Sequence, residues 1–190
     1  IVSTTRRRKK KPIVSSMPEQ IRLASDLQCD SIVDGPGVRM VLWTQGCPHH
    51  CEGCHNPQTH AFDQGKLYDV NDLIRQIRKE PLQTGLTLSG GEPFGQSEAL
   101  LPIARAAKER GLSLWAYSGY TYEQLLADET KRKLLELLDV LVDGRFVQDQ
   151  KDYRLKFKGS RNQRIIDVPA SLSQGTVVLS PYDDDNQRLE

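Results

Sequence analysis

The hydrophobic residues of this chain follow two alternating patterns. Short apolar runs at 38–44, 86–88, 112–117 and 140–142 are rich in leucine, valine and aromatic residues, and a glycine-containing turn follows each. Runs of this length bounded by turn residues are typical of buried strands. We therefore predict four strands at these positions.

Longer segments between these runs carry the spacing of amphipathic helices. Apolar residues recur at i, i+3, i+4 and i+7 within 70–77, and Asp69 stands where an N-cap is expected. The segment 99–110 reads as a second helix that stops at Gly111, with Pro102 in its first turn or at a kink.

A third helical segment opens with a capping box. Thr121 and Gln124 have the required spacing, and a leucine-rich stretch continues to residue 138 with a break expected near Asp128. Strands that alternate with helices imply parallel β/α units. About four units are present, too few to close an eight-stranded barrel, so the predicted fold is α/β, an open partial barrel of parallel strands.

Residues that can bind a ligand or take part in a reaction lie directly after the predicted strands. These are Cys47, Gly90, Ser118 and Asp143. Because the carboxyl ends of parallel strands meet at one edge of a sheet, we expect these residues to share one crevice.

The two ends of the chain differ from its centre. Residues 1–16 hold six basic side chains and no acidic one. A nucleic-acid-binding arm or a transit-like segment is possible by composition, but we favour a disordered, non-native extension with Met17 as the natural start. We expect one domain over 17–170 and a polar tail over 171–190.

The last part of the chain shows little periodicity. From residue 148 onward we expect a polar, irregular tail with one candidate strand at 177–179. The acidic group Asp183–Asp185 is expected to be solvated rather than to bind a metal.

Composition narrows the class of protein. The chain has 190 residues, 37% of them hydrophobic, and a net charge of +1, which argues against a nucleic-acid partner. No apolar run approaches the ~20 residues that span a bilayer. We expect a cytoplasmic protein with no membrane association, whose thiols stay reduced and available to a metal.

Three closely spaced cysteines are the most informative chemical feature. Cys47, Cys51 and Cys54 form a C-x3-C-x2-C pattern on one loop, which suits three irons of a [4Fe–4S] cluster and leaves the fourth iron open. A Cys3His zinc site competes, since all four histidines lie within 49–60. Cys29 is out of register and is expected to be a plain thiol.

A second motif follows the predicted strand at 86–88. Gly90 and Gly91 allow a ligand to approach the backbone closely, and Glu92 adds a carboxylate suited to an ammonium group. An ordinary turn is the alternative. Beside an open iron site, the turn can serve as a cradle for an amino-acid head group.

The cysteine triad followed by Gly-Gly-Glu-Pro resembles the radical S-adenosylmethionine superfamily. Within it, the chain resembles glycyl-radical-enzyme activating enzymes, and most closely the family that activates anaerobic (class III) ribonucleoside-triphosphate reductase. The stretches that carry this narrower resemblance are 33–39, 55–56, 115–120, 141–146 and 159–164. The domain 17–170 would then be a radical S-adenosylmethionine activase domain.

The resemblance implies a cluster, a cofactor and a protein substrate. Cys47, Cys51 and Cys54 would ligate the [4Fe–4S] cluster, whose fourth iron would bind the amino-acid end of S-adenosylmethionine. Reductive cleavage would give a 5′-deoxyadenosyl radical that takes a hydrogen atom from a glycine of the reductase large subunit. A flavodoxin or ferredoxin would supply the electron. The implied cofactor-binding residues are Gly53, Cys54, His55, Gly90, Gly91, Glu92, Ser118 and Asp143.

Several roles stay open at this level. Many superfamily members have an aromatic residue before the third cysteine, where this chain has Gly53, so His55 is the first candidate to contact adenine. Asp143 could equally serve a turn, and Ser118 could cap the helix that follows. An activase of a formate-lyase-type enzyme, or a non-catalytic iron–sulfur or zinc module, remains an alternative.

Overall fold

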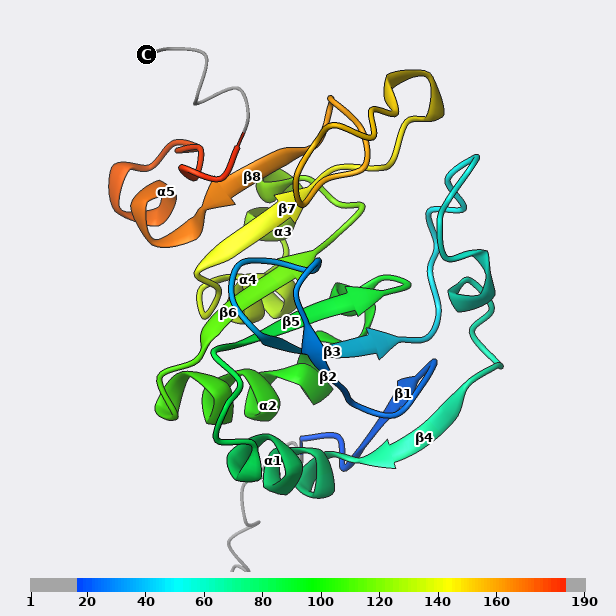
Figure 1. Cartoon of the computed structure of the whole chain (residues 1–190), viewed down its shortest axis with the longest axis vertical. Coiled ribbons are helices and arrows are strands. Elements are labelled where there is room, and N and C mark those ends of the chain that lie inside the picture. Colours follow the sequence, from blue (N-terminus) through cyan, green and yellow to red (C-terminus); the bar gives the residue numbers. More distant parts are fainter. Residues whose placement is uncertain (1–16, 184–190) are drawn as a thin grey trace, which may run out of the picture.

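A computed structural model describes residues 17–183 of the protein, and its centre is a mixed eight-stranded sheet (Figure 1). Four neighbouring strands are parallel: β3 (Arg39–Thr44), β5 (Gly85–Gly90), β6 (Ser113–Tyr117) and β7 (Val140–Asp143). These are the four strands predicted from the apolar runs. Strands buried on both faces read as nearly continuous apolar runs, which is why they were visible in the sequence.

The prediction of parallel strands alone is wrong, because four short strands add antiparallel pairing at the edges of this centre. They are β1 (Gln20–Leu23), β2 (Gln28–Ser31), β4 (Lys66–Asp69) and β8 (Arg164–Asp167). The sheet order is β4-β1-β3-β5-β6-β7-β8, with β2 paired to β3. Each added strand has four residues and mixes polar with apolar positions, so none stands out as an apolar run.

The helices begin and end close to their predicted positions. Asp69 accepts a hydrogen bond from the Asp72 amide at the start of α1, and Thr121 and Gln124 form the predicted capping box. Asp128 ends α3 and caps α4, which confirms the predicted break. Pro102 lies inside α2, beyond its first turn. The helices are α1 (Val70–Lys79), α2 (Ser97–Glu109), α3 (Tyr122–Ala127), α4 (Glu129–Leu135) and α5 (Val168–Gln174), with short 3₁₀ turns η1 (Pro57–Thr59), η2 (Pro93–Gln96) and η3 (Gln148–Gln150).

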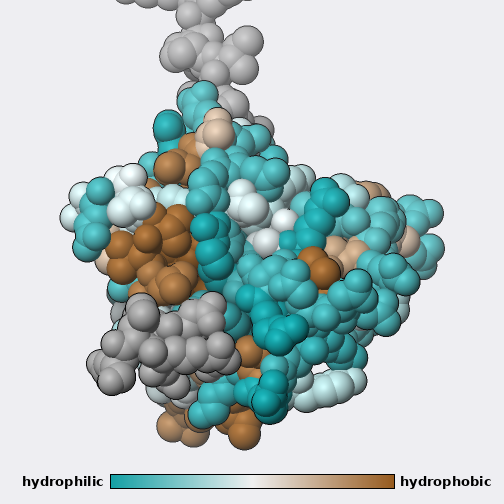
Figure 2. All heavy atoms as spheres, turned by 90° about the horizontal axis from the view of Figure 1, so that it is seen from above, coloured by the Kyte–Doolittle hydropathy of each residue, from teal (hydrophilic) through white to brown (hydrophobic). Residues whose placement is uncertain are grey.

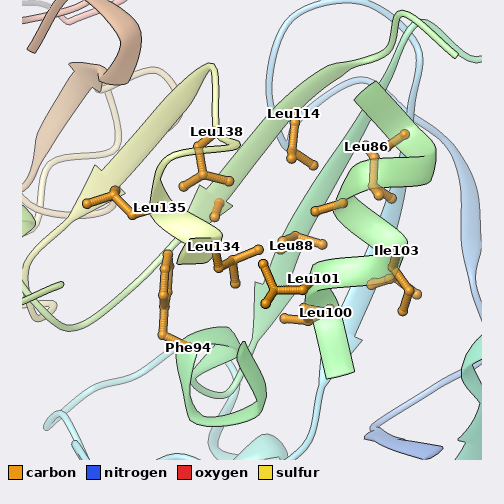
Figure 3. Close-up of a cluster of buried hydrophobic side chains, with 14 of the residues drawn as sticks. Leu86, Leu88, Phe94, Leu100, Leu101, Ile103, Leu114, Leu134, Leu135 and Leu138 are labelled. Atoms are coloured by element: carbon orange, nitrogen blue, oxygen red, sulfur yellow. The ribbon is translucent and has the colours of Figure 1, made fainter. Parts of the chain in front are cut away.

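The main hydrophobic core lies between one face of the sheet and the helices α1, α2 and α4 (Figures 1 and 3). Leu86 and Leu88 of β5 meet Leu100 and Ile103 of α2 there. Alternate residues of the same strands point to the opposite face, as the two-residue period of a strand requires. That face holds a smaller cluster, made by Trp115, Val140, Val142 and Ile165.

A buried arginine anchors the second face of the sheet. The guanidinium of Arg39 is fully buried and donates to Thr87, to the carbonyls of Pro36 and Leu86, and to Ser113, 5.5 Å from the Trp115 ring centre. Burial lowers the pKa of Arg39 to about 10, so the side chain stays charged at neutral pH. Because it binds Pro36, Arg39 fixes the loop before β3 against the sheet.

The prediction of an irregular C-terminal tail is also wrong. Strand β8 and helix α5 lie within it, and α5 crosses the boundary predicted at residue 170. The candidate strand at 177–179 forms a single bridge, from Leu179 to Ile166. Asp183 is buried rather than solvated, since its carboxylate pairs with Lys158 and accepts from the Ile165 amide. Asp184, Asp185 and residues 1–16 lie outside the described residues.

The surface is mainly polar. The face seen in Figure 2 is largely hydrophilic, with hydrophobic residues gathered in separate patches. No helix within residues 17–183 has the length and apolar character needed to cross a membrane.

Candidate iron–sulfur and cofactor site

The cysteine loop leaves the carboxyl end of β3 and is held by its own backbone. The amides of Gly46 and Cys47 donate to the carbonyls of Thr59 and His60, which closes the loop on itself. Inside it, the Cys54 amide donates to the Cys51 carbonyl. In Figure 1 this loop and the one after β7 extend from the same side of the sheet, as predicted for residues at the ends of parallel strands.

The three thiols of the triad open into one cavity, here called the inner hollow. Cys47 is 8% exposed, whereas Cys51 and Cys54 are half-buried. Burial raises the pKa of the Cys47 thiol, so this sulfur is protonated at neutral pH until a metal displaces the proton. The inner hollow is lined by Cys47, His49, Cys51, Cys54, His60, Gly90, Gly91, Tyr117, Ser118, Gly119, Gly144, Phe146 and Gln163.

The three thiols surround one common hollow. A cubane cluster needs this arrangement, because each thiolate binds a different iron. Cys29 lies on β2 against the main core, away from this hollow.

The Gly-Gly-Glu turn packs directly on the cysteine loop. The Gly91 amide donates to the Thr44 carbonyl, and the Glu92 amide donates to the Gly46 carbonyl. Gly90 has φ +103°, and a Cβ at Gly91 would lie 2.3 Å from the Gly46 oxygen. Both glycines are therefore required for this close approach, and their backbone lines the inner hollow.

The carboxylate of Glu92 points into the protein. Its side chain is 0% exposed, and its Oε1 accepts from His49 Nε2 at 2.7 Å, Ser118 Oγ at 2.8 Å and the Gly119 amide at 2.8 Å. Its Oε2 accepts from the Phe94 amide. Four donors thus satisfy the carboxylate, and it does not line the hollow.

His49 connects this carboxylate to the cysteine loop. Its side chain is 4% exposed and also contacts the Tyr120 ring edge-on, with ring centres 4.6 Å apart. A Cβ at Gly119 would lie 2.4 Å from the His49 ring, so glycine is needed opposite the histidine. The contact fixes the segment between Cys47 and Cys51 against the ends of β5 and β6.

A second cavity, the outer hollow, adjoins the first. The two share Cys54, Gly90, Tyr117, Phe146 and Gln163. The outer hollow is further lined by Val33, Asp34, Trp43, His55, Asn56, Ser89, Phe157, Lys158 and Gly159. His55, an exposed residue, contacts Phe146 here with ring centres 5.1 Å apart.

Besides Glu92, two predicted cofactor residues lie outside both cavities. Asp143 is 1% exposed, and its carboxylate accepts from the Tyr122 amide and from Arg164, which also pairs with Glu123. It therefore fixes the end of β7 instead of facing the hollow. Gly53 is exposed and packs against Gln148.

Some residues of the site were missed at the level of sequence. His49 was counted only among the zinc candidates, and Tyr117, Phe146 and Gln163 only within stretches that carry the family resemblance. The sequence could have pointed to Tyr117 and Phe146, because they lie at or just after the carboxyl ends of β6 and β7. Gln163 lies in the loop before β8. Of the two tryptophans, Trp115 is buried in the core, whereas Trp43 is half-buried at the outer hollow.

Comparisons with known proteins agree with this geometry. A family model described as a 4Fe–4S single cluster domain matches residues 33–166, so the fold and site define an iron–sulfur enzyme domain. The anaerobic ribonucleoside-triphosphate reductase-activating protein of Haemophilus influenzae is 37% identical over 146 residues, 70% of this chain and 90% of that protein. The protein of the same name from Escherichia coli strain K12 is 35% identical, with the same shares covered. The chain belongs to the family of anaerobic ribonucleoside-triphosphate reductase-activating proteins.

A solved structure is also similar at a greater distance. QueE from Escherichia coli aligns with a TM-score of 0.47 and 15% identity, over 65% of this chain and 71% of that chain. The family resemblance read from the sequence is confirmed by the relatives, and with it the enzyme class and an iron–sulfur cofactor.

Proposed function

We propose that this protein is a radical S-adenosylmethionine enzyme that installs a glycyl radical on anaerobic ribonucleoside-triphosphate reductase. The observation that carries the proposal is the inner hollow, where three thiols from one loop face a double-glycine turn. Three cysteines leave one iron of a cubane open to a ligand. When bound, the reduced cluster and S-adenosylmethionine supply a 5′-deoxyadenosyl radical that abstracts hydrogen from a glycine.

The residues of the chain hold and orient these groups. Cys47, Cys51 and Cys54 ligate the cluster, and the backbone of Gly90 and Gly91 receives the amino-acid end of the cofactor. Glu92 supports these two glycines from inside the protein. Its carboxylate fixes the cysteine loop through His49. The same carboxylate attracts the ammonium group of the cofactor.

Of the other predicted cofactor residues, two line a hollow and two shape the site from outside it. Ser118 lines the inner hollow and donates to Glu92, so it lies nearest the cofactor. His55 contacts the cofactor from the outer hollow. Gly53 and Asp143 act on the shape of the site, the first by admitting Gln148 beside the cysteine loop and the second by holding Arg164.

A protein substrate suits the open side of the sheet. We infer that the partial barrel stays open at the outer hollow, which admits a glycine-bearing loop of the reductase large subunit. Val33, which is 72% exposed, lies at the edge of that hollow. A flavodoxin or ferredoxin as electron donor and a cytoplasmic location remain predictions of the family resemblance.

The proposal is tested by anaerobic cluster reconstitution followed by assay for 5′-deoxyadenosine. Changing Cys47, Cys51 or Cys54 to alanine should each abolish the [4Fe–4S] signal and the product, because each removes the thiolate of one iron. Cys29→Ala should retain both, and serves as the matched control. A wild-type protein that takes up one zinc and no iron would overturn the radical mechanism.

A further inference from the structure

The position before the third cysteine cannot provide a ring in this chain. Gly53 has φ +72°, a left-handed conformation that disfavours a side chain. A Cβ there would also lie 2.9 Å from the side chain of Gln148 in η3. The usual place for an aromatic contact to the cofactor is therefore occupied by another part of the protein.

An aromatic side chain enters the site from a different element. Phe146 follows β7 and lines both the inner and the outer hollow. Its ring lies 5.1 Å from that of His55, at an interplanar angle of 48°. Phe146 is half-buried, so part of its ring is accessible to a ligand in the cavities.

A phenol stands at the same junction. Tyr117, at the end of β6, also lines both hollows, and its hydroxyl forms no hydrogen bond with any residue from 17 to 183. Burial raises the pKa of Tyr117 far above its usual value, so the hydroxyl is a neutral donor. A hydroxyl donor beside an aromatic ring is what a nucleoside can use, by stacking its base and accepting through its sugar or ring nitrogens.

We propose that Phe146, with His55, forms the stacking surface for the adenine of S-adenosylmethionine, and that Tyr117 donates to the same nucleoside. This rests on the proposed function, since it assigns the nucleoside end of the same cofactor. The amino-acid end lies at Gly90 and Gly91, next to the thiols, and the junction of the two hollows is the adjoining space.

The other aromatic residues of the outer hollow are engaged elsewhere. Trp43 donates from Nε1 to Gln28, and Phe157 packs edge-on against Trp115 and Tyr182. Neither lines the inner hollow. Phe146 and Tyr117 are thus the aromatic residues that line both hollows.

The two ends of the cofactor can be tested separately. Binding of 5′-methylthioadenosine and of methionine would be measured by anaerobic calorimetry on the cluster-loaded protein, for the wild type, Phe146→Leu, Phe146→Tyr and Tyr153→Leu. Loss of one stacking contact should weaken 5′-methylthioadenosine binding by roughly 10-fold in Phe146→Leu. Methionine affinity and iron content should be unchanged, and Phe146→Tyr should bind the nucleoside as the wild type does.

Tyr153→Leu controls for loss of an aromatic ring, since Tyr153 is 87% exposed and lies outside both hollows. Equal nucleoside affinity in Phe146→Leu and wild type would overturn the inference, as would a parallel loss of both ligands with the cluster intact. If the wild-type protein itself bound neither ligand, the proposed function would fail instead. If Phe146→Leu lost its cluster, the test would rest on Phe146→Tyr, which keeps an aromatic ring. Weakened nucleoside binding in Phe146→Tyr would then contradict the stacking role.

Discussion

At the scale of a single residue, the Glu92 side chain is fully buried and does not line the inner hollow. From the sequence, its place after two glycines indicated a direct contact with an ammonium group. In the structure, His49, Ser118 and Gly119 donate to one of its oxygens. The sequence showed that a carboxylate follows the two glycines. It did not show where the Glu92 side chain points, because that depends on donors from two other loops.

Replacing Glu92 by alanine should therefore affect both folding and binding. Four donors lose their acceptor, so the unfolding free energy of the protein before cluster loading should fall by about 2–4 kcal/mol. Cofactor affinity after loading should fall roughly 10- to 100-fold. Urea unfolding and equilibrium binding measure the two effects.

Glu109→Ala is the matched control, since the Glu109 side chain is 72% exposed and pairs only distantly with Arg78. If both alanine variants unfolded at the same urea concentration, the buried network around Glu92 would have no energetic role.

At the scale of elements, the site depends on how the cysteine loop is fixed to the strand ends. The backbone bonds from Gly91 to Thr44 and from Glu92 to Gly46 hold its first part. The His49 side chain holds its centre, and it fits only because Gly119 has no side chain. Loops that are fixed in this way hold their ligands before the metal arrives.

Gly119→Ala tests this attachment, and Gly95→Ala is its control. A Cβ at Gly119 would displace the His49 ring, whereas a Cβ at Gly95 would meet nothing within 4 Å. Loss of the His49–Glu92 contact should lower the unfolding free energy by about 1.5–3 kcal/mol in Gly119→Ala. Less iron should also be retained after anaerobic reconstitution and desalting. Iron retention equal to that of Gly95→Ala would show that His49 does not organise the loop.

At the scale of the whole molecule, the parallel centre of the sheet was predictable and its edges were not. The runs that became β3, β5, β6 and β7 are apolar because both faces of those strands are covered. Strands β1, β2, β4 and β8 are short and partly polar, and only pairing with distant segments defines them.

The same limit applies to single contacts between distant segments. Asp183 looked like part of a solvated acidic tail, yet Lys158 and the Ile165 amide hold it inside the protein. The cysteine triad could be proposed from the sequence because its chemistry depends on local spacing alone. The second half of the site, with Tyr117 and Phe146, depends on which strand ends become neighbours.

The most direct test of the central claim is electron paramagnetic resonance on the partner enzyme. The protein, loaded with its cluster, would be mixed without oxygen with S-adenosylmethionine, a reductant and the anaerobic ribonucleoside-triphosphate reductase. We expect a glycyl-radical doublet on the reductase, and none when Cys51→Ala replaces the wild type. An iron-loaded protein that gave no doublet on the reductase, but gave one on a formate-lyase-type enzyme under the same conditions, would contradict the assignment.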